Sequence, residues 1–190
     1  FILFFKGGSN FGKNKIKFDE DSNLNTVGGG GLLGKFGSNL KQMIIWNNGK
    51  TIYLLKQTVI TLSQDSVLII GDSAQGGIIV TNIYATDITG DGITDLIVSD
   101  GLHIYIFKGG EDFGTYLLTP QNASYTIKSP RLTDFGNYGF IKNFGTDGLR
   151  ACGDITGTGI PFIVVNAEIN EAGYFKAYSF LYAGGKALDS

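Results

Sequence analysis

A nine-residue segment, Asp87–Asp95, carries the residue types in this sequence that are best suited to binding chemistry. It reads Asp-Ile-Thr-Gly-Asp-Gly-Ile-Thr-Asp, with oxygen-bearing side chains at positions 1, 3, 5 and 9 and glycine at position 6. A hard cation such as Ca²⁺ takes about six to eight oxygen ligands at about 2.3–2.6 Å. A loop that curls around the ion turns alternate side chains inward, and a backbone carbonyl at position 7 completes the ring. The spacing therefore predicts a calcium site.

The predicted calcium ligands are four side chains and one backbone carbonyl: Asp87, Thr89, Asp91 and Asp95, with the carbonyl of Ile93. Three carboxylates this close repel one another, and a bound cation would remove that cost. An EF-hand needs a bidentate Glu at position 12, where this sequence has Val98 and continues into a strand-like run, so that template fails. The alternative is a metal-free turn, because Asp and Gly are ordinary turn residues.

Two other segments repeat the loop with fewer carboxylates. In residues 154–165 the side chains at positions 1, 3, 5 and 9 are Asp154, Thr156, Thr158 and Phe162. With one carboxylate left, we expect a structural turn there rather than a metal site. The segment Gly34–Ile45, aligned with Gly34 opposite Asp87, has no carboxylate, so we expect it to bind nothing.

A second phrase follows the loops: an apolar run and then, in its complete form, a pair of glycines. It occurs at Phe1–Gly8, His103–Gly110 and Ser179–Gly185, and Thr51–Lys56 keeps the run without the glycines. Self-similarity at a period of about 50 to 70 residues is typical of solenoids, propellers and related repeat arrays.

The apolar runs predict β-strands, because they are short, rich in β-branched and aromatic residues, and bounded by Gly, Asp or Asn. Three of them are continuously apolar, which predicts burial of both faces; these are Ile44–Trp46, Leu96–Val98 and Ile163–Val165. Further strands are expected at Thr58–Leu62, Val67–Ile70, Gly77–Tyr84, Tyr116–Leu118, Tyr125–Ile127, Phe140–Lys142 and Tyr174–Phe180. No ten-residue segment has helical periodicity, so the chain is predicted to be all-β.

A repeat of four antiparallel strands with a buried inner strand predicts a β-propeller blade. We expect one domain over residues 1–190, with repeat units at about 9–57, 58–110 and 111–185. Residues 1–8 would then be the closing strand of a preceding or last blade. Closed propellers have about four to eight blades, so three units predict a partial propeller, or one completed by assembly. The start at Phe1 without methionine suggests a processed or partial chain.

The segment Asp87–Gly114 joins the acidic loop, the strand, Lys-Gly-Gly and then Phe-Gly. In this order it resembles the FG-GAP repeat, which builds the β-propeller of integrin α subunits and of many other extracellular proteins. Gly153–Gly185 is similar to it to a lesser degree, and Gly31–Gln57 least. The resemblance implies one blade per repeat, calcium in the loop between blade strands, and an extracellular or cell-surface location.

Composition removes several classes of function. A formal net charge of −2 gives no electrostatic footprint for a nucleic-acid partner. A single cysteine, Cys152, excludes an internal disulfide and a zinc cluster, and we expect it to be a small buried residue. The single histidine, His103, lies in an apolar run and is expected to be a strand residue. No apolar run is long enough for a membrane span, and no spacing indicates catalysis, so we expect a protein that is not an enzyme.

Three functions remain. The first is a calcium-stabilised extracellular module that binds a protein partner in adhesion or surface assembly. The second is a self-assembling polymer subunit, because the sequence starts and stops at the same point of the repeat. The third is a carbohydrate-binding propeller, with Trp46, Tyr125 and Tyr138 as candidate stacking residues. The tripeptide Asn122–Ser124 also fits the acceptor pattern for N-glycosylation.

Overall fold

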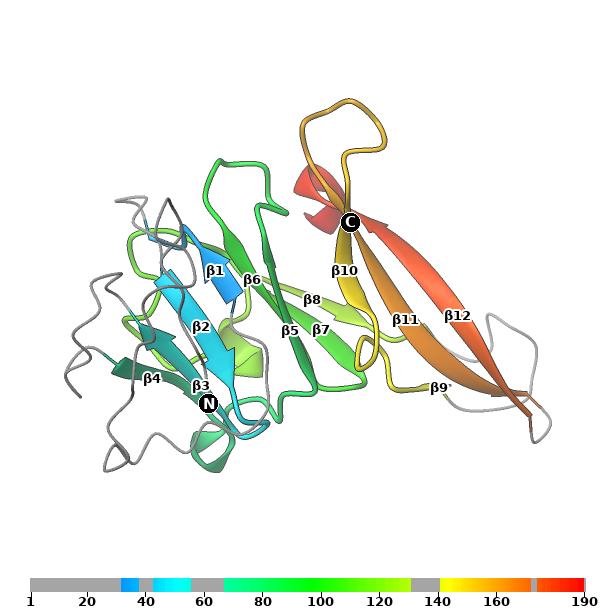
Figure 1. Ribbon diagram of the computed structural model, residues 1–190, viewed down its shortest axis with the longest axis horizontal. Helices are drawn as coiled ribbons and strands as arrows, with labels where there is room; N and C mark the ends of the chain where they lie inside the picture. The colour runs from blue at the N-terminus through cyan, green and yellow to red at the C-terminus, as the bar shows by residue number, and fades with distance from the viewer. Residues whose placement is uncertain (1–31, 38–42, 56–66, 131–140, 172–173, 190) are drawn as a thin grey trace, which may run out of the picture.

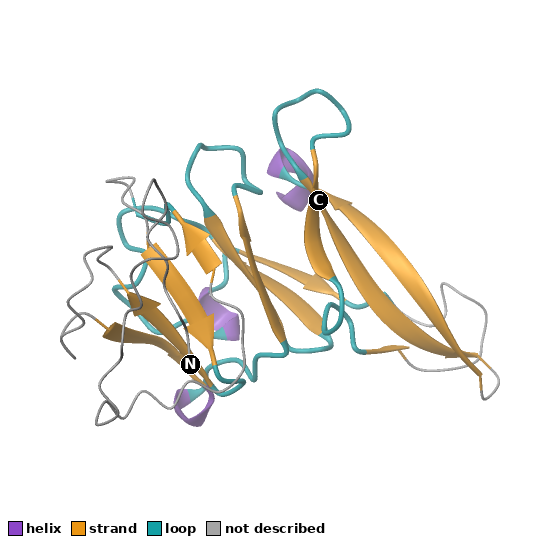
Figure 2. Cartoon of the chain, in the orientation of Figure 1, coloured by secondary structure: helices purple, strands orange, loops and turns teal. Residues whose placement is uncertain are grey.

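The computed structural model describes residues 32–37, 43–55, 67–130, 141–171 and 174–189, and the structural statements below concern these residues. They form three antiparallel sheets of four strands that lie beside one another in chain order (Figure 1). The described residues contain no α-helix; short 3₁₀ turns occur at Ser73–Gln75, Pro120–Asn122 and Gly185–Asp189 (Figure 2). The prediction of an all-β chain is confirmed.

Each of the first two sheets is a simple meander, and the third has a broken first strand. The first sheet contains β1 (Leu32–Gly34), β2 (Met43–Asn47), β3 (Thr51–Leu55) and β4 (Val67–Asp72). The second contains β5 (Asn82–Thr86), β6 (Asp95–Ser99), β7 (His103–Phe107) and β8 (Tyr125–Lys128). The third contains β9 (Ile141–Lys142), β10 (Leu149–Gly153), β11 (Phe162–Glu171) and β12 (Tyr174–Ala183). Both β9 and β10 pair with β11.

The same loop position recurs in the three sheets. The backbone pairs that close the loop between the first two strands are Gly34 with Met43, Thr86 with Asp95, and Gly153 with Phe162. These pairs place Lys35, not Gly34, opposite Asp87, so the sequence alignment of the first copy was wrong by one residue. The shift went unseen because that copy has no carboxylate to anchor the alignment.

The second sheet is packed on both faces. One side of β6 and β7 contributes Leu96, Val98, Tyr105 and Phe107 to a core shared with the first sheet. The other side contributes Ile97, Ile104 and Ile106 to a core shared with the third sheet. The predicted two-sided burial of Leu96–Val98 is therefore confirmed.

The third sheet is covered on one face only. On β11, Ile163 and Val165 are fully buried against the second sheet, whereas Val164 between them is partly exposed. Two-sided burial of Ile163–Val165 was therefore a wrong prediction. Within the described residues, no sheet packs on the side of Val164. Of the predicted strand Ile44–Trp46, Ile45 is fully buried.

Paired glycines make the contact from one sheet to the sheet before it. Gly110 N donates to the Phe36 carbonyl at 2.7 Å, and Gly185 N donates to the Ile88 carbonyl at 2.8 Å. A Cβ on Gly109 would collide with the carbonyl of Thr94. The repeated glycine pair is therefore required because backbone approaches backbone at this point.

Most of the remaining strand predictions agree with the structure. The predicted strands at Val67–Ile70, Tyr125–Ile127 and Tyr174–Phe180 lie within β4, β8 and β12, and the Phe140–Lys142 strand is present as β9. The Gly77–Tyr84 strand begins only at Asn82, because the residues before it cross from the first sheet to the second, where Val80 N donates to the Gly49 carbonyl. Thr58–Leu62 lies outside the described residues.

The predicted strand at Tyr116–Leu118 is wrong. This segment is a loop that runs back to the first sheet, where Leu118 N donates to the Ile70 carbonyl and the Leu118 side chain is fully buried in the core. Apolar residues in a loop that fills a core produce the same short pattern as a strand. Sequence reasoning also missed β1 and β10.

The described sheets do not close into a barrel or propeller. Each of the first two sheets takes its fourth strand from the following predicted repeat unit, β4 from 58–110 and β8 from 111–185. The sheets are therefore offset in phase from the sequence repeat. A blade count and closure by assembly stay predictions.

Candidate metal-binding loop

The acidic loop connects β5 to β6. Because Thr86 and Asp95 are paired, the loop begins and ends at the same edge of the second sheet. Its counterpart connects β10 to β11, and both loops extend from the same end of their sheets (Figure 1). Position 9 of the motif is thus the first residue of a fully buried strand, while positions 4 to 6 are exposed.

Asp87 organises the loop. Its Oδ1 accepts hydrogen bonds from Gly90 N at 2.7 Å and Asp91 N at 3.1 Å, and its Oδ2 accepts one from Gly92 N at 2.7 Å. The φ angles of Gly90 and Gly92 are 80° and 84°, a region that residues with a side chain rarely adopt. One carboxylate and two glycines therefore bend the backbone into a closed turn.

Asp91 already has a cationic partner. Its Oδ1 accepts from Ile93 N at 2.9 Å, and its Oδ2 lies 3.0 Å from Lys108 Nζ. Partial burial by itself would raise the pKa of Asp91, but the Ile93 N–H and the Lys108 ammonium lower it below the usual value. Asp91 is therefore ionised in the neutral pH range, with Lys108 at the rim of the loop.

Asp95 is a fully buried carboxylate that joins the loop to the end of β7. Its Oδ1 accepts from Gly109 N at 2.9 Å, and its Oδ2 accepts from Thr89 N at 2.9 Å. Burial raises the pKa of Asp95, and these two N–H groups offset part of that rise. Asp95 thus connects positions 3 and 9 of the loop with the glycine pair that packs on the first sheet.

The hydroxyl of Thr89 is the unexplained group of the loop. Among the described residues, Thr89 Oγ1 is buried and has no hydrogen-bond partner of good geometry. The same hydroxyl contributes to lowering the pKa of both Asp91 and Asp95, so it lies near both carboxylates although neither contact has the geometry of a hydrogen bond. A buried polar atom without a partner costs about 1–3 kcal/mol. An oxygen of this kind between carboxylates suits a hard cation, whose ligands are all oxygens.

The other carboxylate contacts are those of a turn that compensates its own charge. Backbone N–H groups contact all three aspartates and Lys108 contacts Asp91, so part of the charge repulsion in the sequence is offset without an added ion. In the described part of the chain, no three His, Cys, Asp or Glu side chains gather as a metal site would require. The donor types fit calcium, while the metal-free turn remains a full alternative.

The third-sheet loop shows the structural role of the first aspartate in a loop that has lost the other carboxylates. Asp154 Oδ1 accepts from Thr156 N at 3.0 Å and Gly157 N at 2.9 Å, and its Oδ2 accepts from Gly159 N at 2.5 Å. The Gly159 N–H is the main cause that lowers the pKa of Asp154 to about 2. Asp154 therefore does the work of Asp87 in a loop with no other carboxylate. The arrangement has the form of the turn expected from the sequence, and the expectation that it binds no metal stays a prediction.

Sequence reasoning missed a cluster at the start of β7. His103, the first residue of that strand as expected, places Nδ1 3.1 Å from Asp100 Oδ2, and Tyr105 OH donates to the same oxygen at 2.9 Å. The spacing Asp-x-x-His-x-Tyr could have indicated it, because a turn residue faces the first and third residues of the following strand.

The prediction that Cys152 is buried is wrong, because Cys152 is exposed. The pairing of β10 with β11 shifts register between Ala151 and Gly153, so Cys152 has no partner on the neighbouring strand. A β-bulge of this kind leaves one residue out of the alternation that would otherwise bury it.

The candidate carbohydrate-stacking residues are not brought together. Tyr125 packs against the core between the second and third sheets, the Trp46 side chain is not described, and Tyr138 lies outside the described residues. Asn122 is exposed, with Nδ2 donating to the Leu117 carbonyl at 2.6 Å, and its glycosylation stays a prediction.

Three comparisons were made, with protein-family models, with curated proteins and with solved structures, and none of them found a match to the chain. The resemblance to the FG-GAP repeat therefore rests on the residues of this sequence alone. None of the helical segments that the structure describes is long and apolar enough to cross a membrane.

Proposed function

We propose that this protein is a calcium-binding module built of repeated β-sheets, which binds a protein partner outside the cell or at its surface. The observation that supports calcium is Thr89 Oγ1, a buried oxygen without a partner that lies near the carboxylates of Asp91 and Asp95. The resemblance of Asp87–Gly114 to the FG-GAP repeat supports the extracellular setting.

The residues that would hold the ion are the Thr89 hydroxyl, the carboxylates of Asp91 and Asp95, and the Ile93 carbonyl. The carboxylate of Asp87 accepts hydrogen bonds from three backbone N–H groups, so one of its four lone pairs remains available for an ion. When bound, calcium would neutralise the acidic loop and give the Thr89 oxygen a partner. Its role would be structural, because ion binding to the folded state alone adds to stability.

The affinity should be low. The Lys108 ammonium at Asp91 Oδ2 repels a metal ion that approaches the same carboxylate, and this competition between two cations weakens ion binding. Extracellular calcium modules have dissociation constants of about 10⁻⁴–10⁻³ M, and this loop is expected in that range. An affinity in the range of intracellular sensors would not fit a loop that carries its own ammonium group.

A calcium titration of the whole chain tests the proposal. We expect calcium to raise the Tm in a saturable way and a chelator to reverse the rise, while Asp91→Asn abolishes the response. Asp112→Asn, an exposed aspartate outside the loop, serves as the matched control and should respond like the unmodified chain. A Tm that does not change at calcium concentrations of about 10⁻² M, above the extracellular range, would remove calcium from the account.

A further inference from the structure

Phe36, Ile88 and Ile155 hold the same place in the three sheet loops, two residues after the backbone pair that closes each loop. Phe36 and Ile88 are 0% exposed, whereas Ile155 is 60% exposed. Three apolar residues at one repeat position thus differ only in whether a later sheet covers them. The same surface is therefore present on all three sheets. Among the described residues it is covered on the first and second sheets and exposed on the third.

The cover on the first two is a glycine pair. Gly110 N donates to the Phe36 carbonyl, and Gly185 N donates to the Ile88 carbonyl. A Cβ on Gly184 would collide with the Ile88 carbonyl, so the fit requires glycine there. Each loop therefore receives the glycine pair of the following sheet. In the described part of the chain, no glycine pair reaches Ile155.

The strand positions below Ile155 continue the same surface. Ile97 and Ile106 face each other across β6 and β7 and are fully buried by the third sheet. Their counterparts on the third sheet are Val164, partly exposed, and Leu181, 51% exposed. With Ile155 and the partly exposed Phe162, these residues form what we call the outer patch.

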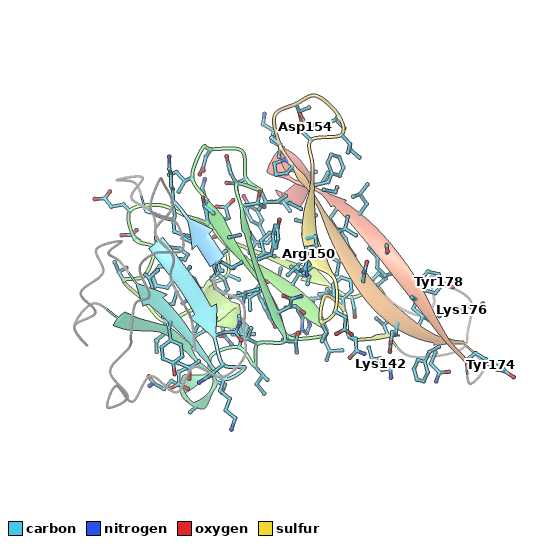
Figure 3. All side chains as sticks on the ribbon, in the orientation of Figure 1. Lys142, Arg150, Asp154, Tyr174, Lys176 and Tyr178 are labelled. Carbon is cyan, nitrogen blue, oxygen red and sulfur yellow. The ribbon has the colours of Figure 1, made fainter. Side chains whose placement is uncertain are left out.

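The outer patch is confined to the loop end of the third sheet. At the opposite end, Lys142 Nζ lies 3.4 Å from Glu168 Oε2 and 3.8 Å from the centre of the Phe175 ring. Figure 3 shows Lys142 at that end and Asp154 in the loop at the other. The charged end is satisfied by its own contacts, so the apolar end is the part that lacks a cover.

The repeated contact restricts what can cover the outer patch. A sheet that docks as the second and third do must carry two glycines directly after its third strand. The first sheet cannot, because the residues after β3 are Lys56, Gln57 and Thr58. The sequence holds one more apolar run followed by Lys-Gly-Gly, at Phe1–Gly8, which lies outside the described residues.

We infer that the outer patch of the third sheet binds a second copy of this chain, through that copy's Phe1–Gly8 segment, with Gly7 and Gly8 against Ile155. The inference deepens the proposed function, since it names the protein partner as the chain itself. The two surfaces are different, so the contact is heterologous and repeats head to tail into a ring or a filament.

Sedimentation and light scattering of the whole chain over a concentration series test the inference. The unmodified chain is expected to associate, and Ile155→Asp should weaken association about tenfold or more, because a charge would be buried in an apolar contact without a partner. Ile79→Asp is the matched control: Ile79 is 68% exposed and lies before β5, away from the outer patch. A chain that stays monomeric throughout, or equal effects of the two substitutions, would overturn the inference.

A mixing experiment tests the head-to-tail direction. Gly7→Val should also prevent association, because Gly7 matches Gly109 and Gly184, and a Cβ on Gly184 would collide with a backbone carbonyl of the covered loop. Each variant keeps one intact surface: Ile155→Asp keeps the Gly7–Gly8 segment and Gly7→Val keeps the outer patch. Mixed, the two variants are expected to form a one-to-one dimer that grows no further. If the mixture stays monomeric while both variants retain the unmodified Tm, the assigned pair of surfaces is wrong.

The failure of this inference can be told apart from the failure of the proposed function by repeating the series in calcium and in chelator. Association that persists without any calcium-dependent change in Tm leaves the outer patch in place and removes the calcium proposal. A monomeric chain whose Tm rises with calcium does the reverse.

Discussion

Lys108 Nζ lies 3.0 Å from Asp91 Oδ2, so the acidic loop contains a cation of its own. The third sheet lacks both partners: register places Thr158 at the position of Asp91 and Ala183 at the position of Lys108. The ammonium of Lys108 is therefore a competitor for any metal ion that Asp91 would bind.

Replacing that lysine should strengthen calcium binding. With Lys108→Met, Asp91 no longer exchanges one cation for another, and we expect the calcium dissociation constant from calorimetry to fall several-fold. Without calcium the same variant should lose up to about 1 kcal/mol of stability, the usual worth of an exposed ion pair. Lys128→Met, an exposed lysine on β8, is the control. An unchanged or weaker calcium affinity would mean that the two cations do not compete.

The glycine pairs should be intolerant of any side chain. Gly109→Ala places a Cβ against the Thr94 carbonyl, and overpacking of this kind costs about 1–3 kcal/mol. Gly76→Ala is a useful comparison, because it meets nothing within 4 Å and has a φ of 79°, so it reports the backbone cost alone. Denaturant unfolding should rank Gly109→Ala as the more destabilised. The opposite order would mean that the sheets are free to move apart at this contact.

The sequence predicts features that depend on local residue types and recur in the repeats. It does not predict features that depend on packing between residues distant in the chain. The Gly-Gly phrase, the acidic turn and the buried run Leu96–Val98 follow from residue type and spacing, and the structure places all three as expected. Leu118 was misread, because a loop that fills a core has the same apolar pattern as a strand. The bulge at Cys152 changes which residues face inward without leaving a mark in the composition of β10.

The exposure of Ile155 is a second kind of limit. Nothing in the residues of that loop distinguishes it from Ile88, since the two are the same amino acid after the same aspartate. Their burial differs because a following sheet covers Ile88 and none of the described sheets covers Ile155. The residue pattern of the loop does not predict which sheet packs on it. The contacts of Asp91 are similar in kind: its spacing predicted a metal ligand, and only the end of β7, distant in sequence, brings Lys108 to it.

The hydrogen bond between Tyr105 and Asp100 should contribute measurably to stability. Tyr105 is buried, and its hydroxyl donates to Asp100 Oδ2 at 2.9 Å. Removing it with Tyr105→Phe leaves that oxygen with one partner fewer, and we expect a loss of about 0.5–1.5 kcal/mol in chemical denaturation. The exposed Tyr116 offers a control, because Tyr116→Phe should change stability little. Equal effects of the two changes would assign no role to the cluster.

Asp154 should give the third-sheet loop a characteristic dependence on pH. Its pKa in the folded chain is about 2, well below the ordinary value, mainly because Gly159 N donates to it. A lowered pKa means that the folded state favours the ionised carboxylate. Its stabilising effect is therefore fully present above the ordinary pKa of about 3.9 and is lost as the pH falls through about 2.

Asp154→Asn keeps one acceptor oxygen and replaces the other with an NH₂ group, so the variant should have the lower Tm near neutral pH. The two Tm curves should then converge between about pH 4 and pH 2. A gap that stays constant over this range would show that the charge of Asp154 does not hold the turn, and that shape alone makes aspartate suitable at the first position of both loops.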